Sequence, residues 1–222
     1  MTLTPVARLE NDFPTKFGLP RQSGLNGALI SRVVMEKPYA REDFLRGIGD
    51  YSHLWLLWGF DVPASANATV RPPRLGGNER RGVFATRSPF RPNPLGLTVV
   101  RLEKVEIGAG TACLTVSGAD MKSGTLIYDI KPYIPYADCV TDAIGGFADA
   151  HANDRLNVVF PESLKALLPQ DKLPALISAL SQDPRPQYQN DPARVYGFYY
   201  AGRDVRFRVD GGTLTVIEIN TL

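Results

Sequence analysis

An arginine-rich stretch, residues 71–97, carries the strongest chemical signal in the chain. It reads RPPRLGGNERRGVFATRSPFRPNPLGL. Six arginines and one acid, Glu79, lie between Arg71 and Arg91, which gives a local charge of +5 in a chain whose net charge is +2, so the remainder carries −3. Arginine without lysine suits planar, bidentate binding of phosphates and carboxylates. The stretch therefore predicts an anion-binding surface.

Prolines stiffen the same stretch. Pro72, Pro73, Pro92 and Pro94 each fix their own φ angle and restrict the residue before them. A stiff loop loses little conformational entropy when it binds an anion. We therefore favour an anion-binding loop, and a solvated basic loop is the alternative interpretation.

Composition limits the classes of function. The 222 residues can form one large domain, or a main domain with a smaller appendage. The sequence has no run of 18 apolar residues and does not begin like a signal peptide, so we predict a cytoplasmic protein without membrane contact. Its two cysteines and two histidines are too few and too scattered for a zinc site or a disulfide framework, and we expect no metal.

Short strands separated by loops dominate residues 1–139. The expected strands are 5–9, 28–35, 52–60, 82–85, 97–107, 112–117 and 126–130, with one short helix at 41–48. The run SHLWLLWGF at 52–60 is apolar enough to be buried on both faces. So many short strands with almost no helix between them favour a closed antiparallel β-barrel. No GxGxxG follows a strand, which argues against a Rossmann cofactor site.

A change of composition after Asp138 indicates a second unit. Residues 140–160 are small and polar, and leucines at helical spacing predict helices at 161–168 and 173–180. Strands are expected at 195–200, 205–209 and 213–219, with a tight hairpin turn at 210–212. We thus predict a mainly β fold, with an antiparallel closed β-barrel over residues 1–139 and a smaller α+β domain over residues 140–222.

Six motifs together resemble the TsaA-like family in order and spacing. They are PRQSG at 20–24, SHLW at 52–55, RPPRLGG at 71–77, GVFATRSPFRPNPLGL at 82–97, DIKPY at 129–133 and DPRP at 183–186. Characterised bacterial members of this family are TrmO-type tRNA N6-methyltransferases. The resemblance implies a β-barrel enzyme that uses S-adenosylmethionine, acts as a homodimer, binds tRNA and methylates N6-threonylcarbamoyladenosine beside the anticodon.

The resemblance also implies a methyl-donor pocket. The segments that match the family's cofactor pocket are Gln22, Ser23, Gly24, His53, Leu54, Arg87, Leu97, Ser123, Gly124, Thr125 and Leu126. Arg87 is expected to pair with the donor's carboxylate, and Leu54, Leu97 and Leu126 to form an apolar wall. Ordinary core packing is an equally good explanation for Leu54 and Leu97.

Methyl transfer requires that the acceptor nitrogen be placed in line and lose its proton. Asp129 is the candidate that orients or accepts this proton, with Lys131 and Tyr133 on the same side of the strand. An ion pair between Asp129 and Lys131 with only a structural role is the competing explanation. Arg91 or Lys131 is available for the threonyl carboxylate, and Asn93 for the base.

Other arginines are assigned to tRNA. Arg71 and Arg74 belong to the basic stretch, and Arg206 and Arg208 share one face of a late strand. The alternative is a non-catalytic nucleotide- or RNA-binding barrel, which would show exposed aromatics interleaved with basic residues. The stretch offers only two, Phe84 and Phe90, and this favours a pocket. A metal-dependent hydrolase is a weaker third option.

Overall fold

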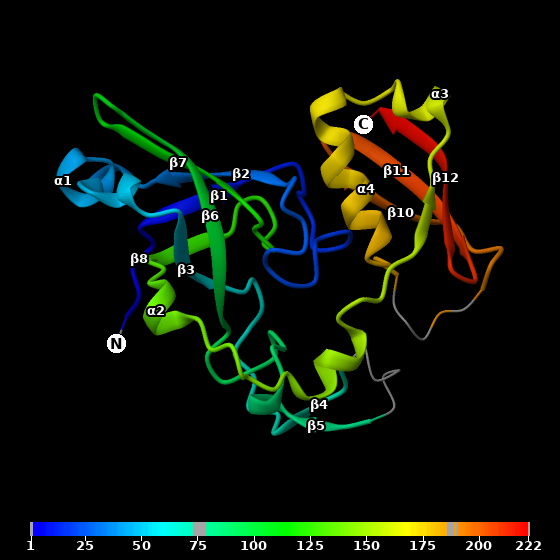
Figure 1. The fold of residues 1–222 in the computed structure, drawn as a ribbon, viewed down its shortest axis with the longest axis horizontal. Coiled ribbons are helices and arrows are strands. Elements are labelled where there is room, and N and C mark those ends of the chain that lie inside the picture. The colour runs from blue at the N-terminus through cyan, green and yellow to red at the C-terminus, as the bar shows by residue number, and fades with distance from the viewer. Residues whose placement is uncertain (1, 73–78, 186–188, 190, 222) are drawn as a thin grey trace.

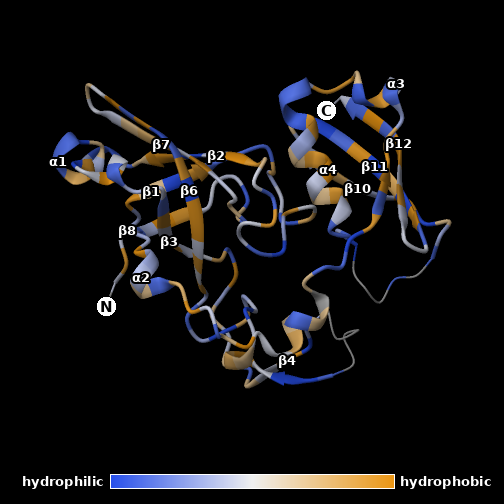
Figure 2. Ribbon diagram, in the orientation of Figure 1, coloured by the Kyte–Doolittle hydropathy of each residue, from blue (hydrophilic) through white to orange (hydrophobic). Residues whose placement is uncertain are grey.

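The computed structural model describes residues 2–72, 79–185, 189 and 191–221. These residues form two lobes, each built on its own sheet, and a loop of the N-terminal half lies between them (Figure 1). Hydrophobic residues follow the strands in both lobes (Figure 2). The predicted mainly β fold with a closed antiparallel barrel is confirmed.

The barrel lobe is closed by six strands in the order β1-β2-β7-β6-β3-β8. They are β1 (Ala7–Glu10), β2 (Ile30–Met35), β3 (His53–Gly59), β6 (Leu95–Gly108), β7 (Thr111–Ser117) and β8 (Leu126–Pro132). All neighbours are antiparallel. Closure pairs every strand on both sides and leaves no open sheet edge.

Strand β3 shows how the barrel is filled. Its side chains alternate between the interior and the exterior, and Leu54, Leu56 and Trp58 lie in the core. The expectation that this strand is buried on both faces is wrong, because a barrel strand has only one interior face. The outward-facing Trp55 and Leu57 are half-buried.

Short strands and short helical elements lie outside the six barrel strands. Beside the arginine-rich stretch, β4 (Thr69–Val70) pairs with β5 (Arg81–Gly82). The strand expected at 82–85 is wrong beyond residue 82, because Val83–Ala85 form a 3-10 turn. The short helical elements are η1 (Lys37–Tyr39), α1 (Glu42–Leu45), η2 (Ile48–Asp50) and α2 (Pro135–Asp138). Helix α1 is shorter than expected, and Gly47 adopts a left-handed φ of 82° just after it.

The second lobe has a four-stranded sheet in the order β10-β11-β12-β9. Its elements are η5 (Gly146–His151), β9 (Asn157–Val159), α3 (Glu162–Lys165), η6 (Gln170–Lys172), α4 (Leu173–Ser181), β10 (Tyr196–Tyr200), β11 (Arg203–Asp210) and β12 (Thr213–Thr221). Leucines of α4 are buried in one cluster with the inward-facing residues of β10, β11 and β12. Strand β9, in a segment for which no element was expected, runs parallel to β12.

The long loop of residues 11–29 joins the lobes. Phe13 and Leu29 are fully buried in the core of the second lobe, although barrel strands flank them in sequence. The Lys172 ammonium lies 2.7 Å from a carboxylate oxygen of Asp12, and the backbone N–H of Ala201 donates to the Asp12 carbonyl at 3.0 Å. This loop is therefore packed between the lobes.

Candidate functional site

The turn Gln22–Gly24 is held against the barrel. The backbone N–H of Gly24 donates to the carbonyl of Gly118 at 2.9 Å, just beyond the end of β7. Gly24 has a φ of +74°, a value that other residues adopt only with strain. The guanidinium of Arg87 donates to the side-chain oxygen of Gln22. The fold thus brings together two predicted donor-binding segments that are far apart in sequence.

A carboxylate that sequence reasoning missed lies beside this turn. The hydroxyl of Thr98 donates to Asp120 at 2.7 Å and accepts from the indole N–H of Trp58 at 2.9 Å. Burial raises the pKa of Asp120, against the opposing effects of the Thr98 hydrogen bond, the Arg87 charge and the backbone N–H of Ser23. Nothing in the local sequence marks Asp120, because the partners that define its environment lie on other segments.

Another segment predicted to bind the donor, residues 123–126, forms the turn that leads into β8. Gly124 has a φ of +85°, and its N–H donates to the carbonyl of Leu9 at 2.8 Å. The N–H of Ser123 donates to the carbonyl of Phe13 at 2.8 Å, and Thr125 bonds its hydroxyl to the carbonyl of Lys122. This turn is therefore tied to the start of the loop that carries Gln22–Gly24.

The three leucines that were expected to form an apolar wall of the donor pocket do not lie on one surface of the chain. Leu54 is fully buried inside the barrel. Leu97 pairs with the outward-facing Leu57 and is 58% exposed, so it lies on the opposite face of the same sheet. Leu126 is half-buried at the start of β8. His53 is also on the outer face, where its ring nitrogen Nδ1 lies 2.9 Å from the Ser52 hydroxyl.

The predicted acceptor residues of β8 share the outer face of the barrel. Lys131 Nζ lies 2.8 Å from Asp129, and this partner raises the pKa of Lys131. Both side chains remain substantially exposed. The ring of Tyr133 lies 5.8 Å from that of Trp55 and 6.2 Å from that of His53. The ion pair between Asp129 and Lys131 that the structural explanation expects is therefore present. Because both side chains are exposed, a ligand could still reach them.

Two other residues predicted to contact the substrate, Asn93 and Arg91, differ in their hydrogen bonds to the protein. Asn93 is exposed in the segment before β6. The guanidinium of Arg91 donates to the carbonyls of Thr86 at 3.2 Å and Ser88 at 3.5 Å, so it also braces its own loop.

The other arginines assigned to tRNA differ in their partners. Arg71 is exposed, and Arg74 lies outside the described residues. Arg206 contacts two carboxylates, Asp204 at 2.9 Å and Glu218 at 3.4 Å. Arg208, two residues further along β11, is exposed and has no ion-pair partner within the described part of the chain. The charge of Arg208 is thus the more available of the two for a phosphate.

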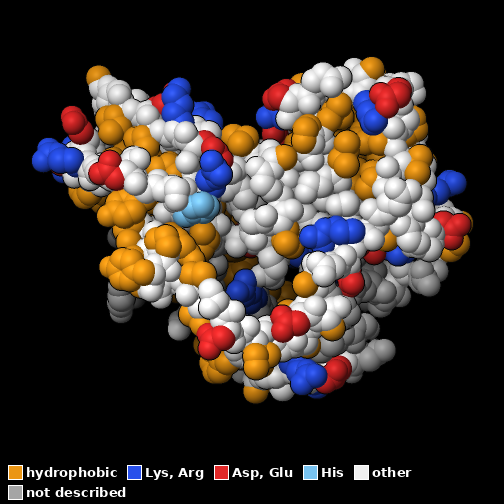
Figure 3. All heavy atoms as spheres, in the orientation of Figure 1, with side chains coloured by type: hydrophobic (Ala, Val, Ile, Leu, Met, Phe, Trp, Pro, Cys, Tyr) orange, Lys and Arg blue, Asp and Glu red, His pale blue; other side chains and the backbone are white. Residues whose placement is uncertain are grey.

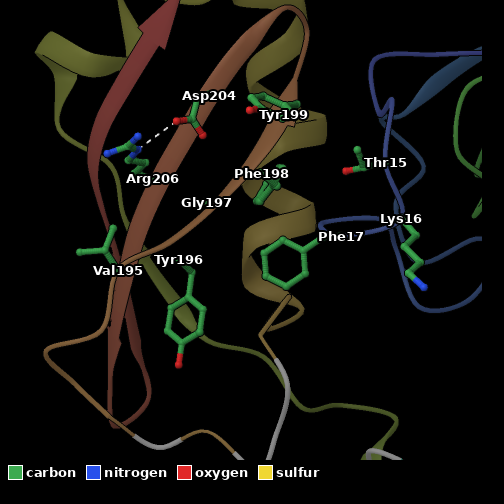
Figure 4. A pocket seen from close by; sticks show the side chains of 10 residues that line it. All are labelled: Thr15, Lys16, Phe17, Val195, Tyr196, Gly197, Phe198, Tyr199, Asp204 and Arg206. Atoms are coloured by element: carbon green, nitrogen blue, oxygen red, sulfur yellow. Dashed lines mark hydrogen bonds and ion pairs between the residues drawn. The ribbon is translucent and has the colours of Figure 1, made fainter. Parts of the chain in front are cut away.

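A groove of about 670 Å³ lies on the second lobe (Figure 4). Residues 15–17 of the joining loop form one side and residues 195–199 the other, with Asp204 and Arg206 also in its lining. None of the predicted donor-binding residues lines it. Its lining combines aromatic side chains with charged ones, and we assign no ligand to it.

Membrane-spanning helices and metal-binding clusters are both absent from the described residues. Across the described residues, no helix is long and apolar enough to span a membrane. The same residues contain no group of three histidine, cysteine, aspartate or glutamate side chains placed to hold a metal ion.

Comparisons with known proteins agree on one family. Residues 8–139 match the model of the tRNA-methyltransferase O N-terminal domain, and residues 153–222 that of the TrmO C-terminal domain. A tRNA (adenine(37)-N6)-methyltransferase from Escherichia coli is 37% identical, over 96% of this chain and 95% of its own. One of the same name from Eikenella corrodens is 44% identical, over 76% and 96%.

Two other matches concern the cofactor and the fold. An S-adenosyl-L-methionine-binding protein from Archaeoglobus fulgidus is 37% identical, over 65% of this chain and 98% of its own. A crystal structure of TrmO from Pseudomonas aeruginosa superposes with a TM-score of 0.80 at 33% identity, covering 100% of this chain and 97% of that one.

Proposed function

The chain belongs to the tRNA-methyltransferase O family, and from this membership we propose that it is an S-adenosylmethionine-dependent tRNA methyltransferase acting on N6 of adenosine 37. The observation that carries the proposal is the match to the Escherichia coli enzyme along nearly the whole of both chains. We further propose N6-threonylcarbamoyladenosine as the substrate nucleoside and the cytoplasm as the location.

The residues at the barrel rim fit the methyl donor. Its carboxylate requires a cation, which Arg87 provides beside Gln22. Its hydroxyl and ammonium groups require acceptors. Asp120 offers a buried carboxylate, close enough for the Arg87 charge and the Ser23 backbone N–H to lower its pKa against the effect of burial. When bound, S-adenosylmethionine supplies an electrophilic methyl group on its sulfonium.

The chain itself orients the acceptor and removes its proton. Asp129 is the proposed partner of the N6 proton, because it is the exposed carboxylate in the DIKPY motif. Lys131, whose Nζ lies 2.8 Å from Asp129, is proposed to pair with the threonyl carboxylate. Arg71, Arg91, Arg206 and Arg208 are proposed to contact tRNA, and Asn93 and Tyr133 to border the flipped base.

An apolar outer face supports a homodimer. Trp55, Leu57, Leu97 and Val99 share the exterior of β3 and β6, and hydrophobic side chains gather over this side of the barrel lobe (Figure 3). Leu97 is 58% exposed and its three neighbours are half-buried, and an apolar patch that remains open to solvent is typical of an interface. A two-fold pair through this face would join two arginine-rich stretches into one basic surface, with the neighbouring Asp129 and Lys131 at the edge of the interface.

A turnover assay tests the proposed function. The purified chain is incubated with S-adenosylmethionine, tRNA and a chelator, and formation of the demethylated donor is followed. We expect product only when donor and tRNA are both present. A non-catalytic RNA-binding barrel would bind tRNA and form no product.

A further inference from the structure

Arg21, directly before the donor-binding turn, reaches into the second lobe. Its Nη2 donates to the backbone carbonyl of Asp183 at 2.6 Å and to that of Arg185 at 3.1 Å. These carbonyls belong to the DPRP motif that follows α4, of which Pro186 lies outside the described residues. Two motifs of the sequence are therefore in direct contact.

An ion pair between Asp183 and Arg185 lies within the turn that Arg21 contacts. The Nε of Arg185 donates to both carboxylate oxygens of Asp183, at 3.0 and 3.2 Å, and the two side chains are only 10% and 22% exposed. Asp183 has a φ of 52°, which aspartate and asparagine tolerate better than most residues. A shielded ion pair adds little net stability. Here the pair lies within the turn whose two carbonyl oxygens accept from the Arg21 guanidinium.

The donor-binding turn is thus anchored from two sides. Arg21 ties its beginning to the second lobe, whereas Gln22 and Gly24 are tied to the barrel lobe through Arg87 and Gly118. A short segment held at both ends has little conformational freedom left, which lowers the entropy lost when a ligand binds.

We propose that Arg21 is a positioning residue for the methyl donor and that the Asp183–Arg185 turn is its anchor. This inference rests on the proposed function and assigns the DPRP motif a role in donor binding. The contacts of Gln22 and Gly24 remain when Arg21 is removed. Donor affinity should therefore weaken rather than disappear.

The chain offers a matched control. Lys172 and Asp12 form another polar contact between the second lobe and the same loop, at 2.7 Å, but they join it near its start, away from Gln22–Gly24. Lys172→Met loosens the junction without releasing the donor-binding turn. Asp183→Asn keeps the turn's backbone shape and removes only the ion pair.

The test measures donor affinity, kinetics and thermal unfolding of the full chain. Arg21→Ala and Asp183→Asn should weaken S-adenosylmethionine binding about tenfold, with KM for the donor raised and kcat at saturating donor retained. Arg21→Lys should recover part of the affinity, and Lys172→Met should keep all of it. Unchanged donor affinity in Arg21→Ala, or equal losses in Lys172→Met, would overturn this inference alone. If the unmodified chain does not bind the donor, the proposed function fails and takes the inference with it.

Discussion

Arg87 and Gln22 are 65 residues apart in sequence, and the guanidinium of the first donates a hydrogen bond to the side-chain oxygen of the second. This contact joins the arginine-rich stretch to the turn that we propose binds the methyl donor. Arg87 carries a positive charge and Gln22 a neutral amide. A ligand carboxylate that binds here would therefore meet the guanidinium, the amide and the backbone of the turn. The proposed donor site is organised around this pair.

Arg87→Ala should weaken donor binding roughly ten- to a hundredfold, because a charge-assisted pair with the donor carboxylate is lost. Calorimetry with S-adenosylmethionine and with its demethylated product measures this loss. Arg101→Ala is a suitable control, since Arg101 is an exposed arginine paired with Glu103. If Arg87→Ala bound donor normally while the salt dependence of its tRNA binding collapsed, the arginine-rich stretch would be an RNA clamp.

The two arginines of β11 should contribute unequally to tRNA binding. Arg208→Ala should lower the slope of log affinity against log salt by about one, because one phosphate contact is lost. Arg206→Ala should change it less, since Asp204 and Glu218 already neutralise that guanidinium. Filter binding over a range of salt concentrations gives both slopes. Donor affinity should stay constant in both variants, and a larger effect of Arg206→Ala would contradict the assignment.

Asp120 predicts a specific pH dependence of stability. Burial raises its pKa in the folded chain above the reference value of 3.8. The folded state therefore binds more protons than the unfolded state between these two values, and the free energy of unfolding contributed by Asp120 falls as pH rises through this window. Urea unfolding at a series of pH values should show this fall in the unmodified chain and not in Asp120→Asn.

The partner of Asp120 supplies the control. Thr98→Val removes the hydrogen bond that favours the ionised carboxylate, so the fall in stability should extend to higher pH. Parallel stability curves for the unmodified chain and Asp120→Asn would show that the carboxylate is not linked to folding.

Leu57→Lys should separate the proposed homodimer. Leu57 lies at the centre of the apolar outer face, opposite Leu97 on β6 and Asp129 on β8. A charge placed there must be desolvated on association. Light scattering at micromolar concentration should give the dimer mass for the unmodified chain and the monomer mass for the variant. Ile217→Lys, on the second lobe, should leave the dimer intact, and a monomeric unmodified chain with full activity would remove the homodimer.

Local patterns in the sequence predicted most of the fold. Alternation and apolar runs marked the barrel strands, and leucine spacing marked α4. Strand β9 was missed because it has three residues in a polar segment and is defined by its pairing with β12. The face occupied by a side chain was also beyond sequence reasoning, since only the strand register places Leu54 inside and Leu97 outside.

The candidate site was predicted in part for the same reason. Motifs marked residues whose neighbours in sequence are distinctive, such as Gln22 and Arg87. Asp120 gains its proposed role from Thr98, which is distant in sequence, and no motif contains it. Arg21 and the Asp183–Arg185 turn do lie in motifs, but their contact is created by folding, and neither motif indicates that the other is its partner.

Mass spectrometry of tRNA nucleosides tests the central claim most directly. The chain is incubated with tRNA that carries threonylcarbamoyladenosine and with a donor whose methyl group is deuterated, and the anticodon fragment is then digested and analysed. The account predicts one deuterated methyl group on N6 of the nucleoside at position 37, and a loss of this signal in Asp129→Asn. A tRNA that returns unlabelled, or labelled at another position, would contradict it.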